Sequence, residues 1–271
     1  MSDAYGLAGS PIDRSPSPAM HNAAFAALGI DAHYTLRPSG IDDVDTVLAE
    51  LANGTWKGLN ITTPLKAVLA PCVELDDVAR RARAVNTLWR DGDRVCGTLT
   101  DVAGVTEPLR TAAFRGGVGL IIGAGGAARA AVLALDALGT EVHVAARRGD
   151  RAADLLQILQ PGKRATAHTL DDAAALAELF GSLNVVVQAT PVGTGGDSHA
   201  LPWEQAGDRL IAFDMVYLPR RTPFLIQAEA CGCTTIAGIE MLLAQGAASF
   251  TVWTGRQAPV AVMRNALLPA S

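Results

Sequence analysis

The chain has 271 residues, 49% of them hydrophobic and 18% charged, with a formal net charge of −5 at pH 7. This length can hold two medium-sized domains, each with its own core, and the acidic balance excludes a general attraction to nucleic acid or to anionic membranes. No run approaches 18 apolar residues without a charge, and the N-terminus lacks the profile of a signal peptide, so we expect a globular protein of the cytoplasm.

The first part of the chain alternates segments that are typical of strands and of helices. Strands are predicted at 4–9, 33–36 and 57–62, and helices at 17–29 and 41–51. This alternation predicts an α/β domain with a mostly parallel sheet. Ligands of such sheets bind beyond the carboxyl ends of the strands, so polar residues near those ends are candidates for a site.

Ser15 and Ser17 lie in a proline-rich turn between the first predicted strand and the first predicted helix. Ser17 is the expected N-cap of this helix, with Pro18 at its first position. Capping explains Ser17 but not Ser15. A small anion held by the two hydroxyl groups and the helix N-terminus is the competing interpretation, and the residues alone leave both open.

Asn60 and Thr62 lie at the end of the third predicted strand, and Lys66 follows Pro64, which is expected to open a short helix. The Lys66 amine could therefore turn back toward the crevice beyond the strand. A solvated surface lysine is the alternative for this position.

The next predicted segments are a charged helix and a β-hairpin. They lie at 76–83 for the helix and at 84–89 and 95–99 for the two strands. The Asp91-Gly92 pair between the strands favours a hairpin turn. Asp101 begins a further helix, either as its cap or as a functional carboxylate. The glycines after Arg115 mark the expected boundary between a first domain, 1–113, and a second, 114–237.

The chain is organised around the apolar run 118–122 and the sequence Gly123-Ala124-Gly125-Gly126-Ala127-Ala128 that follows it. A strand that leads through G-x-G-x-x-A into an Ala-rich helix is the unit that places a pyrophosphate at a helix N-terminus. Gly123 allows a tight turn, Gly125 allows the backbone to approach the phosphates, and Ala128 allows strand and helix to pack closely. Simple crowding at a strand-to-helix turn is the alternative.

The next predicted strand, 141–146, ends in Arg147-Arg148. A site for NAD usually has an acidic residue at this place, for the ribose 2′-hydroxyl. Two arginines and no acid favour the 2′-phosphate of NADP, since the guanidinium group matches a phosphate dianion. A solvated basic loop, with Arg151 paired to nearby acids, is the alternative.

The remaining segments continue the alternation. Helices are predicted at 152–159, 171–180 and 223–231, strands at 165–168, 184–188, 210–214 and 234–236, and a long helix from 238. This pattern predicts a Rossmann-type, doubly wound sheet. Gln245 lies on the apolar stripe of the last helix, either as a satisfied core amide or as a group that faces the cleft. The four cysteines lack the spacing of a zinc or redox site, so we interpret them as free thiols and expect no metal.

Many ordered motifs match one known family. They are Gly9-Ser10-Pro11-Ile12, Ser15-x-Ser17-Pro18-x-x-His21-Asn22, Asn60-Ile61-Thr62-x-Pro64-x-Lys66, Ala84-Val85-Asn86-Thr87, Thr100-Asp101, Gly123-Ala124-Gly125-Gly126-Ala127, Ala189-Thr190-Pro191-Val192-Gly193, Asp214-x-x-Tyr217-x-Pro219-x-x-Thr222-Pro223 and Gly238-x-x-Met241-Leu242-x-x-Gln245. By these motifs the chain resembles the shikimate dehydrogenases along nearly its full length. The resemblance implies an NADP-dependent oxidoreductase that interconverts 3-dehydroshikimate and shikimate in the chorismate pathway, as a monomer or a homodimer.

The resemblance also implies a role for individual residues. Ser15 and Ser17 would hold the substrate carboxylate, and Lys66 and Asp101 would form the catalytic pair. The residues implied around the substrate ring and its hydroxyls are Asn60, Thr62, Asn86, Tyr217 and Gln245. The residues implied for NADP are Gly123, Ala124, Gly125, Gly126, Ala127, Arg147, Arg148, Arg151, Thr190, Met215, Gly238 and Asp77. The last helices, about 238–271, would return to the first domain and make it discontinuous.

Several positions depart from the family pattern. Arg14 replaces a His, Leu99 an Asn, Arg83 a Gly and Gln188 an Asn, and Ala146-Arg147-Arg148 replaces Asn-Arg-Thr. Arg14 and Leu99 flank implied substrate residues, so quinate or an amino-substituted analogue stays open as the substrate. A nucleotide-binding sensor without turnover and a structural scaffold are the alternatives from other classes. A sensor without turnover would not need Lys66 and Asp101, a proton donor with its carboxylate partner. A structural scaffold would not need a phosphate-binding glycine loop or a basic strand tip.

The chemistry expected of the catalytic pair follows from the reaction. A carbonyl that accepts hydride develops alkoxide character, which an ammonium donor stabilises and protonates. The Asp101 carboxylate is the expected partner of the Lys66 ammonium group.

Overall fold

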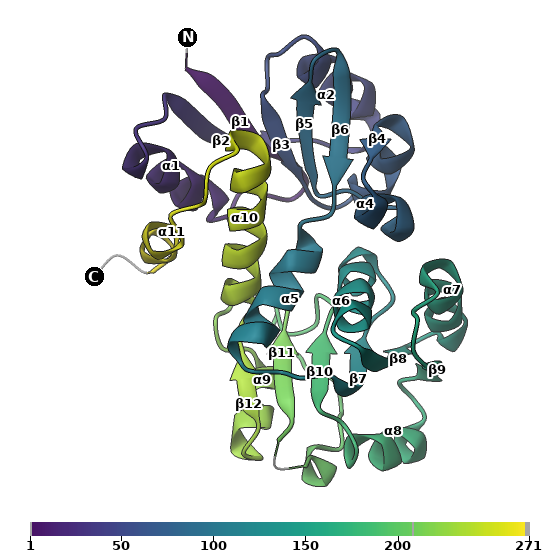
Figure 1. The fold of residues 1–271 in the computed structure, drawn as a ribbon. Helices are drawn as coiled ribbons and strands as arrows, with labels where there is room; N and C mark the ends of the chain where they lie inside the picture. Colours follow the sequence, from purple (N-terminus) through teal and green to yellow (C-terminus); the bar gives the residue numbers. More distant parts are fainter. Residues whose placement is uncertain (1, 208, 269–271) are drawn as a thin grey trace. The chain divides into compact units, whose positions relative to one another are not determined.

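The computed structural model describes residues 2–207 and 209–268, which form two compact units (Figure 1). The first unit contains the described residues up to Thr100 and those from Leu243 onward, and the second contains those from Asp101 to Leu242. The first unit is therefore discontinuous in sequence. The predicted first domain ends at residue 113 and resumes at 238, whereas the first unit ends at Thr100 and resumes at Leu243. The helix Asp101–Thr111 and residues 238–242 of the last long helix therefore belong to the second unit.

The first unit is built on a six-stranded mixed sheet of order β2-β1-β3-β5-β6-β4. Its elements are β1 Asp3–Gly9, α1 Ser17–Ala27, β2 Ala32–Pro38, α2 Val44–Ala52, β3 Gly58–Ile61, α3 Lys66–Leu69, β4 Glu74–Leu75, α4 Asp77–Ala82, β5 Thr87–Asp91, β6 Arg94–Thr98, α11 Val260–Ala266 and the greater part of α10 Gly238–Thr254, with 3₁₀ turns at Ile41–Asp43 and Ala70–Cys72. Strand β1 is parallel to β2 and β3, and β4 is parallel to β6. The predicted hairpin is confirmed as the antiparallel pair β5–β6.

The alternation of side chains along β3 separates a core face from a polar face. Leu59 and Ile61 enter a buried apolar cluster with residues of α2 and α3. Gly58 and Asn60 therefore face the other side of the sheet, because successive side chains of a strand point to opposite faces. A Cβ atom on Gly58 would lie only 2.4 Å from the indole of Trp253, so glycine is needed there for α10 to pack closely. This packing brings α10 over Asn60.

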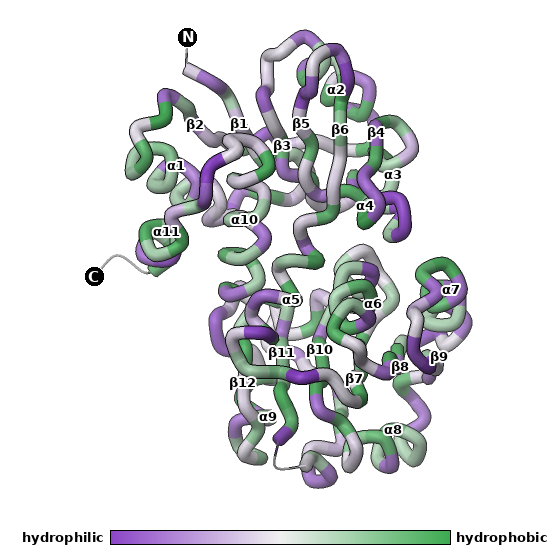
Figure 2. Tube along the Cα trace, viewed as in Figure 1, coloured by the Kyte–Doolittle hydropathy of each residue, from purple (hydrophilic) through white to green (hydrophobic). Residues whose placement is uncertain are grey.

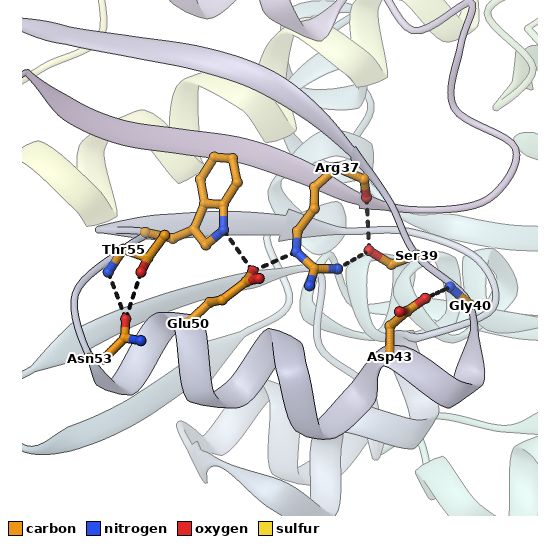
Figure 3. Close-up of polar contacts among 8 residues, drawn as sticks. Arg37, Ser39, Gly40, Asp43, Glu50, Asn53 and Thr55 are labelled. Carbon is orange, nitrogen blue, oxygen red and sulfur yellow. Dashed lines mark hydrogen bonds and ion pairs between the residues drawn. The ribbon is translucent and has the colours of Figure 1, made fainter.

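A polar cluster ties the carboxyl end of β2 to α2 (Figure 3). Arg37 Nε donates to Glu50 Oε2 at 2.6 Å, and Trp56 Nε1 donates to the same oxygen at 2.9 Å. The hydrogen bond from Arg37 is the main cause that lowers the pKa of the Glu50 carboxyl. Gly40 N donates to Asp43 Oδ2 at 2.7 Å and closes the turn into the helix. These bonds anchor the edge strand of the sheet.

The second unit is built on six parallel strands in the order β12-β11-β10-β7-β8-β9. Its elements are α5 Asp101–Thr111, β7 Gly117–Ile122, α6 Gly126–Ala137, β8 Thr140–Ala146, α7 Gly149–Leu159, β9 Ala165–Thr169, α8 Ala173–Phe180, β10 Val185–Gln188, β11 Ile211–Asp214, α9 Pro223–Ala230 and β12 Thr234–Ile236, with a 3₁₀ turn at Trp203–Gln205. This is the order of the doubly wound nucleotide-binding sheet, so the predicted Rossmann fold is confirmed.

Helices cover both faces of this sheet. Leu120 and Ile122 of β7 pack with Val186 of β10 in a buried cluster with α8 and α9. On the opposite face, a Cβ atom on Gly119 would meet Leu135 of α6 at 2.9 Å. Figure 2 shows the hydrophobic character of these strands. The strand order reverses between β7 and β10, which is where ligands of such sheets bind.

The predicted N-cap of α1 is wrong. Pro16 occupies the cap position, Ser17 is the first helical residue, and Met20 N donates to Pro16 O at 3.2 Å. The helix therefore begins one residue before the predicted position, and its N-terminus has no side-chain cap,. Among the described residues, no helix is both long and apolar enough to cross a membrane.

Candidate active site

The first unit joins five of the predicted substrate-binding residues in one buried polar network. They are Ser15, Ser17, Asn60, Asn86 and Gln245. Asn60 lies at its centre on the polar face of β3. Its Nδ2 donates to Asn86 O and to Thr87 Oγ1, each at 3.2 Å. Asn60 pairs with Thr87 across β3 and β5, so the register of the sheet brings these groups together.

Ser15 and Ser17 connect to Asn60 through Tyr34. Ser15 Oγ donates to Ser17 Oγ at 3.1 Å and accepts from Ser17 N at 3.3 Å. The Ser17 side chain is hydrogen-bonded to Tyr34, whose hydroxyl donates to Asn60 Oδ1 at 2.9 Å. Burial raises the pKa of Tyr34 well above its usual value, against a smaller opposite effect of Ser17, so Tyr34 keeps its proton and remains a donor,.

Asn86 connects the network to the end of β6 and to α10. Its Oδ1 accepts from Thr100 N at 2.6 Å and from Thr100 Oγ1 at 3.1 Å. Its Nδ2 is directed to Gln245 Oε1 at 3.4 Å. Thr100 immediately precedes Asp101, so Asn86 holds the backbone at the point where the predicted catalytic carboxylate begins α5.

His21 lies beside this network with no exposed surface. Its ring stacks on Tyr34 at a centroid distance of 4.5 Å and an interplanar angle of 8°. Neither ring nitrogen has a hydrogen-bond partner among the described residues. Burial lowers the pKa of His21 to about 3, so the imidazole is neutral at physiological pH,.

The other predicted residues of the first unit lie on short segments near the ends of strands. Thr62 follows β3 directly, and its N–H donates to Ala8 O at 2.9 Å. Lys66 is the half-buried first residue of α3. Asp77 is the first residue of α4, where its almost fully exposed side chain pairs with Arg80 at 2.6 Å. A shallow groove of about 610 Å³ elsewhere in this unit is lined by none of the predicted residues.

In the second unit, the glycine loop connects β7 to α6 as predicted. Gly123 has a φ of 114°, and a Cβ atom there would lie 2.8 Å from the Thr190 side chain. A Cβ atom on Gly125 or Gly126 would meet nothing within 4 Å. Gly125 is the N-cap of α6 and supplies no side-chain cap. The N-terminus of α6 is therefore bordered by open space, as a bound phosphate requires.

The loop after β10 is organised by Gln188. Its buried Oε1 accepts from Thr190 N at 3.1 Å and from Thr190 Oγ1 at 2.9 Å. The Thr190 hydroxyl also lies 3.1 Å from His199 Nε2. Burial lowers the pKa of His199; the negative charge of Asp197 opposes this effect, and the positive charge of Arg147 adds to it to a smaller extent,.

The arginines that follow β8 differ in their surroundings. Arg148 makes two hydrogen bonds to Asp150, with Nη2 at 2.6 Å and Nε at 3.2 Å. Arg151 lines a cavity of about 270 Å³ together with Arg129 and Ala124 of the glycine loop. Of the three arginines predicted to bind NADP, Arg151 is therefore the one that lines this cavity beside the glycine loop.

Met215, Tyr217 and Gly238 come together near the carboxyl end of β11. Met215 N donates to Gln188 O at 3.0 Å. A Cβ atom on Gly238 would lie 2.4 Å from Val216 O and 2.8 Å from Tyr217 N, so only glycine allows this approach. The buried Asp214 carboxylate accepts from Val216 N and from the Thr222 hydroxyl and holds the loop between them.

Sequence reasoning missed several members of these networks. They are Tyr34, Ser249 and His199. Ser249 lies four residues after Gln245 on α10, so helical spacing places both on one face and was a usable signal. His199 lies in an irregular loop, where no periodicity predicts what a side chain contacts.

The strand order and glycine loop of the second unit, together with the polar network of the first, define a dinucleotide-binding α/β protein of the dehydrogenase type. Residues 7–88 match the family model described as the shikimate dehydrogenase substrate binding domain, and residues 238–268 match the shikimate 5′-dehydrogenase C-terminal domain. The shikimate dehydrogenase (NADP(+)) of Natronomonas pharaonis is 42% identical over 266 residues, which cover 98% of each chain. The chain therefore belongs to the shikimate dehydrogenase family.

Solved structures with the same fold include two complexes with shikimate. Shikimate 5-dehydrogenase from Thermus thermophilus, in complex with NADP(H) and shikimate, is 33% identical and has a TM-score of 0.87, with 97% of this chain and 98% of that chain covered. Shikimate 5-dehydrogenase from Listeria monocytogenes, in complex with shikimate and NAD, is 29% identical and has a TM-score of 0.91, with 98% and 96% covered.

Proposed function

We propose that this protein catalyses the reversible, NADP-dependent reduction of 3-dehydroshikimate to shikimate. The observation that carries the proposal is the buried network of the first unit, in which Ser17, Asn60 and Asn86 are connected by hydrogen bonds. Such a network presents fixed hydroxyl and amide groups to a polyhydroxylated acid. The family relationship supports the same substrate, because the relatives are named for it.

The second unit fits a dinucleotide phosphate. Open space above Gly125 and Gly126, and a helix N-terminus without a side-chain cap, suit a pyrophosphate,. Arg147 and Arg151 would hold the 2′-phosphate that distinguishes NADP. Arg148 is a weaker candidate because its guanidinium group is already paired with Asp150. Thr190, Met215 and Gly238 would line the remainder of this site. When bound, the reduced cofactor supplies a hydride.

Within the first unit, Ser15 and Ser17 would bind the carboxylate, and the amides of Asn60, Asn86 and Gln245 would bind the hydroxyls. Lys66 would donate a proton to the carbonyl oxygen during reduction and stabilise the alkoxide as its charge develops. Asp101 is the carboxylate that the family motif pairs with Lys66. Thr62 of the first unit and Tyr217 of the second are the other residues that the family motifs imply for the substrate, and family membership implies Asp77 for the cofactor.

Initial rates measured with shikimate and with quinate, each with NADP and with NAD, test the proposal. We expect the highest kcat/KM for shikimate with NADP. A higher kcat/KM for quinate than for shikimate would instead assign the protein to another activity of the same family. No oxidation of either polyol with either cofactor, by a protein that is folded, would contradict the proposed function.

A further inference from the structure

Three buried hydroxyl groups form a closed triangle in the first unit. Thr87 Oγ1 lies 2.8 Å from Ser249 Oγ and 3.0 Å from Thr100 Oγ1, and the Thr100 and Ser249 oxygens are 3.0 Å apart. Thr87 lies on β5, Thr100 follows β6, and Ser249 lies on α10. The triangle therefore joins three segments of the chain, and the exposed fraction of its members is at most 6%.

The role of Ser249 in this triangle follows from its other partners. A hydroxyl group donates one hydrogen bond and accepts two. The Ser249 hydroxyl donates to Gln245 O at 3.0 Å, which leaves its oxygen able to accept two further hydrogen bonds,. It accepts from Asn60 Nδ2 at 2.9 Å. Ser249 is thus an acceptor that fixes which end of the Asn60 amide faces α10.

The hydrogen bonds of Asn60 and Asn86 define the orientation of their side-chain amides. Asn60 directs its Nδ2 toward the triangle and its Oδ1 toward the donor hydroxyl of Tyr34. Asn86 directs its Oδ1 toward Thr87 and Thr100, at 3.3 and 3.1 Å. Its Nδ2 must then lie on the side of Gln245. Neither amide can turn over without bringing like groups together.

We infer that Ser249 is a positioning residue for substrate binding. Ser249 accepts directly from Asn60 Nδ2, and through the Thr87 and Thr100 hydroxyl groups it supports the orientation of Asn86 that the backbone N–H of Thr100 sets. In this orientation the N–H groups of Asn86, rather than its oxygen, lie on the side where a substrate hydroxyl binds. Groups held in the binding orientation before the ligand arrives lose less conformational freedom when it binds. This inference rests on the proposed function, since it concerns the same substrate.

Replacement of Ser249 by Ala removes the acceptor with little change in volume. We expect the Ser249→Ala variant to raise both the Kd of shikimate, measured by calorimetry, and its KM by roughly 3- to 15-fold, the loss expected for one uncharged hydrogen bond. The kcat should stay within about twofold, because a positioning effect on ground-state binding changes KM first. A purely structural role would not separate KM from kcat in this way.

Thr106→Val is the matched control. Thr106 is a buried residue whose hydroxyl donates to the carbonyl oxygen four residues earlier, at Val102, as Ser249 does to Gln245. It lies on α5, outside the triangle, so its variant should bind shikimate as the wild type does. An equal loss of affinity in both variants would contradict the inference.

A second variant, Thr87→Val, removes another corner of the triangle. If the three hydroxyls act as a unit, the double variant Ser249→Ala/Thr87→Val should weaken binding about as much as either single change. If Ser249→Ala does not fold, the same rise in Kd for Thr87→Val supports the inference and an unchanged Kd overturns it. A folded Ser249→Ala protein with the wild-type Kd also overturns it and leaves the proposed function intact. Wild-type protein that fails to bind shikimate contradicts both.

Discussion

Replacement of His21 by Phe should remove a large part of the acid sensitivity of this fold. His21 is completely buried against Tyr34 and Trp253, and neither ring nitrogen has a hydrogen-bond partner among the described residues. A phenyl ring can keep the stacking contacts and has no polar atoms to desolvate. Because an unpaired buried polar group costs about 1–3 kcal/mol, the variant should also be more stable at neutral pH by an amount of that order.

The pH dependence follows from the two states of His21. Its pKa is about 3 in the folded protein and 6.5 in an unperturbed chain. The unfolded state therefore binds a proton first as the pH falls, so the stability is fully present above pH 6.5 and is lost progressively toward pH 3. At about 1.4 kcal/mol per pH unit, the wild type should lose about 2 kcal/mol between pH 7.5 and pH 5 from this group alone.

Urea denaturation at pH 7.5 and pH 5, followed by tryptophan fluorescence, measures this difference. The loss of unfolding free energy between the two pH values should be smaller by about 2 kcal/mol in His21→Phe than in the wild type. His33→Gln is the control, since His33 is exposed and should leave the wild-type loss unchanged. The same loss in His21→Phe and wild type would refute the argument.

Four other substitutions have expected outcomes. Burial raises the pKa of Asp214 to about 6 from 3.8, so the native state binds the proton more tightly and the wild type loses up to about 3 kcal/mol from this group as the pH rises from 4 to 7,. The Asp214→Asn variant should lack this loss; the same change in unfolding free energy between pH 4 and pH 7 in variant and wild type would contradict this. Arg83→Gly should raise the free energy of unfolding by about 1 kcal/mol, since Arg83 ends α4 in the left-handed region with φ 51°; thermal melting that shows no gain would count against it,. Arg151→Ala should raise the KM for NADP roughly 10- to 100-fold with less change for NAD, and Arg148→Ala should have a smaller effect; an equal loss with both cofactors would exclude a phosphate contact,.

The fold of the second unit could be predicted because its signals are local. The apolar run before Gly123, the glycines themselves and the regular alternation of strands and helices together indicate the observed sheet. The first helix shows the limit of such signals. A serine before a proline is typical of an N-cap, yet the chain begins the helix one residue earlier, because Pro16 O can accept from Met20 N.

The candidate site could be predicted only in part. Family motifs indicated Asn60 and Asn86, but the contacts between them depend on the register of β3 against β5, which pairs Asn60 with Thr87. No sequence pattern gives that register, so the hydroxyl triangle could not be derived. Ser249 joins the network from a residue 189 positions away from Asn60, across a contact made by tertiary packing alone.

The most direct test of the proposed mechanism is the single-turnover rate of Lys66→Ala with shikimate and NADP, together with the Kd of shikimate for the same variant. The developing alkoxide accepts a hydrogen bond more strongly than the ground-state ketone does, so Lys66 should contribute to the transition state more than to binding. We expect turnover to fall by roughly 10²- to 10⁴-fold with little change in Kd, and Lys57→Ala, which alters an exposed lysine, to behave as the wild type,. A folded Lys66→Ala protein that turns over at a near-normal rate would contradict the central claim.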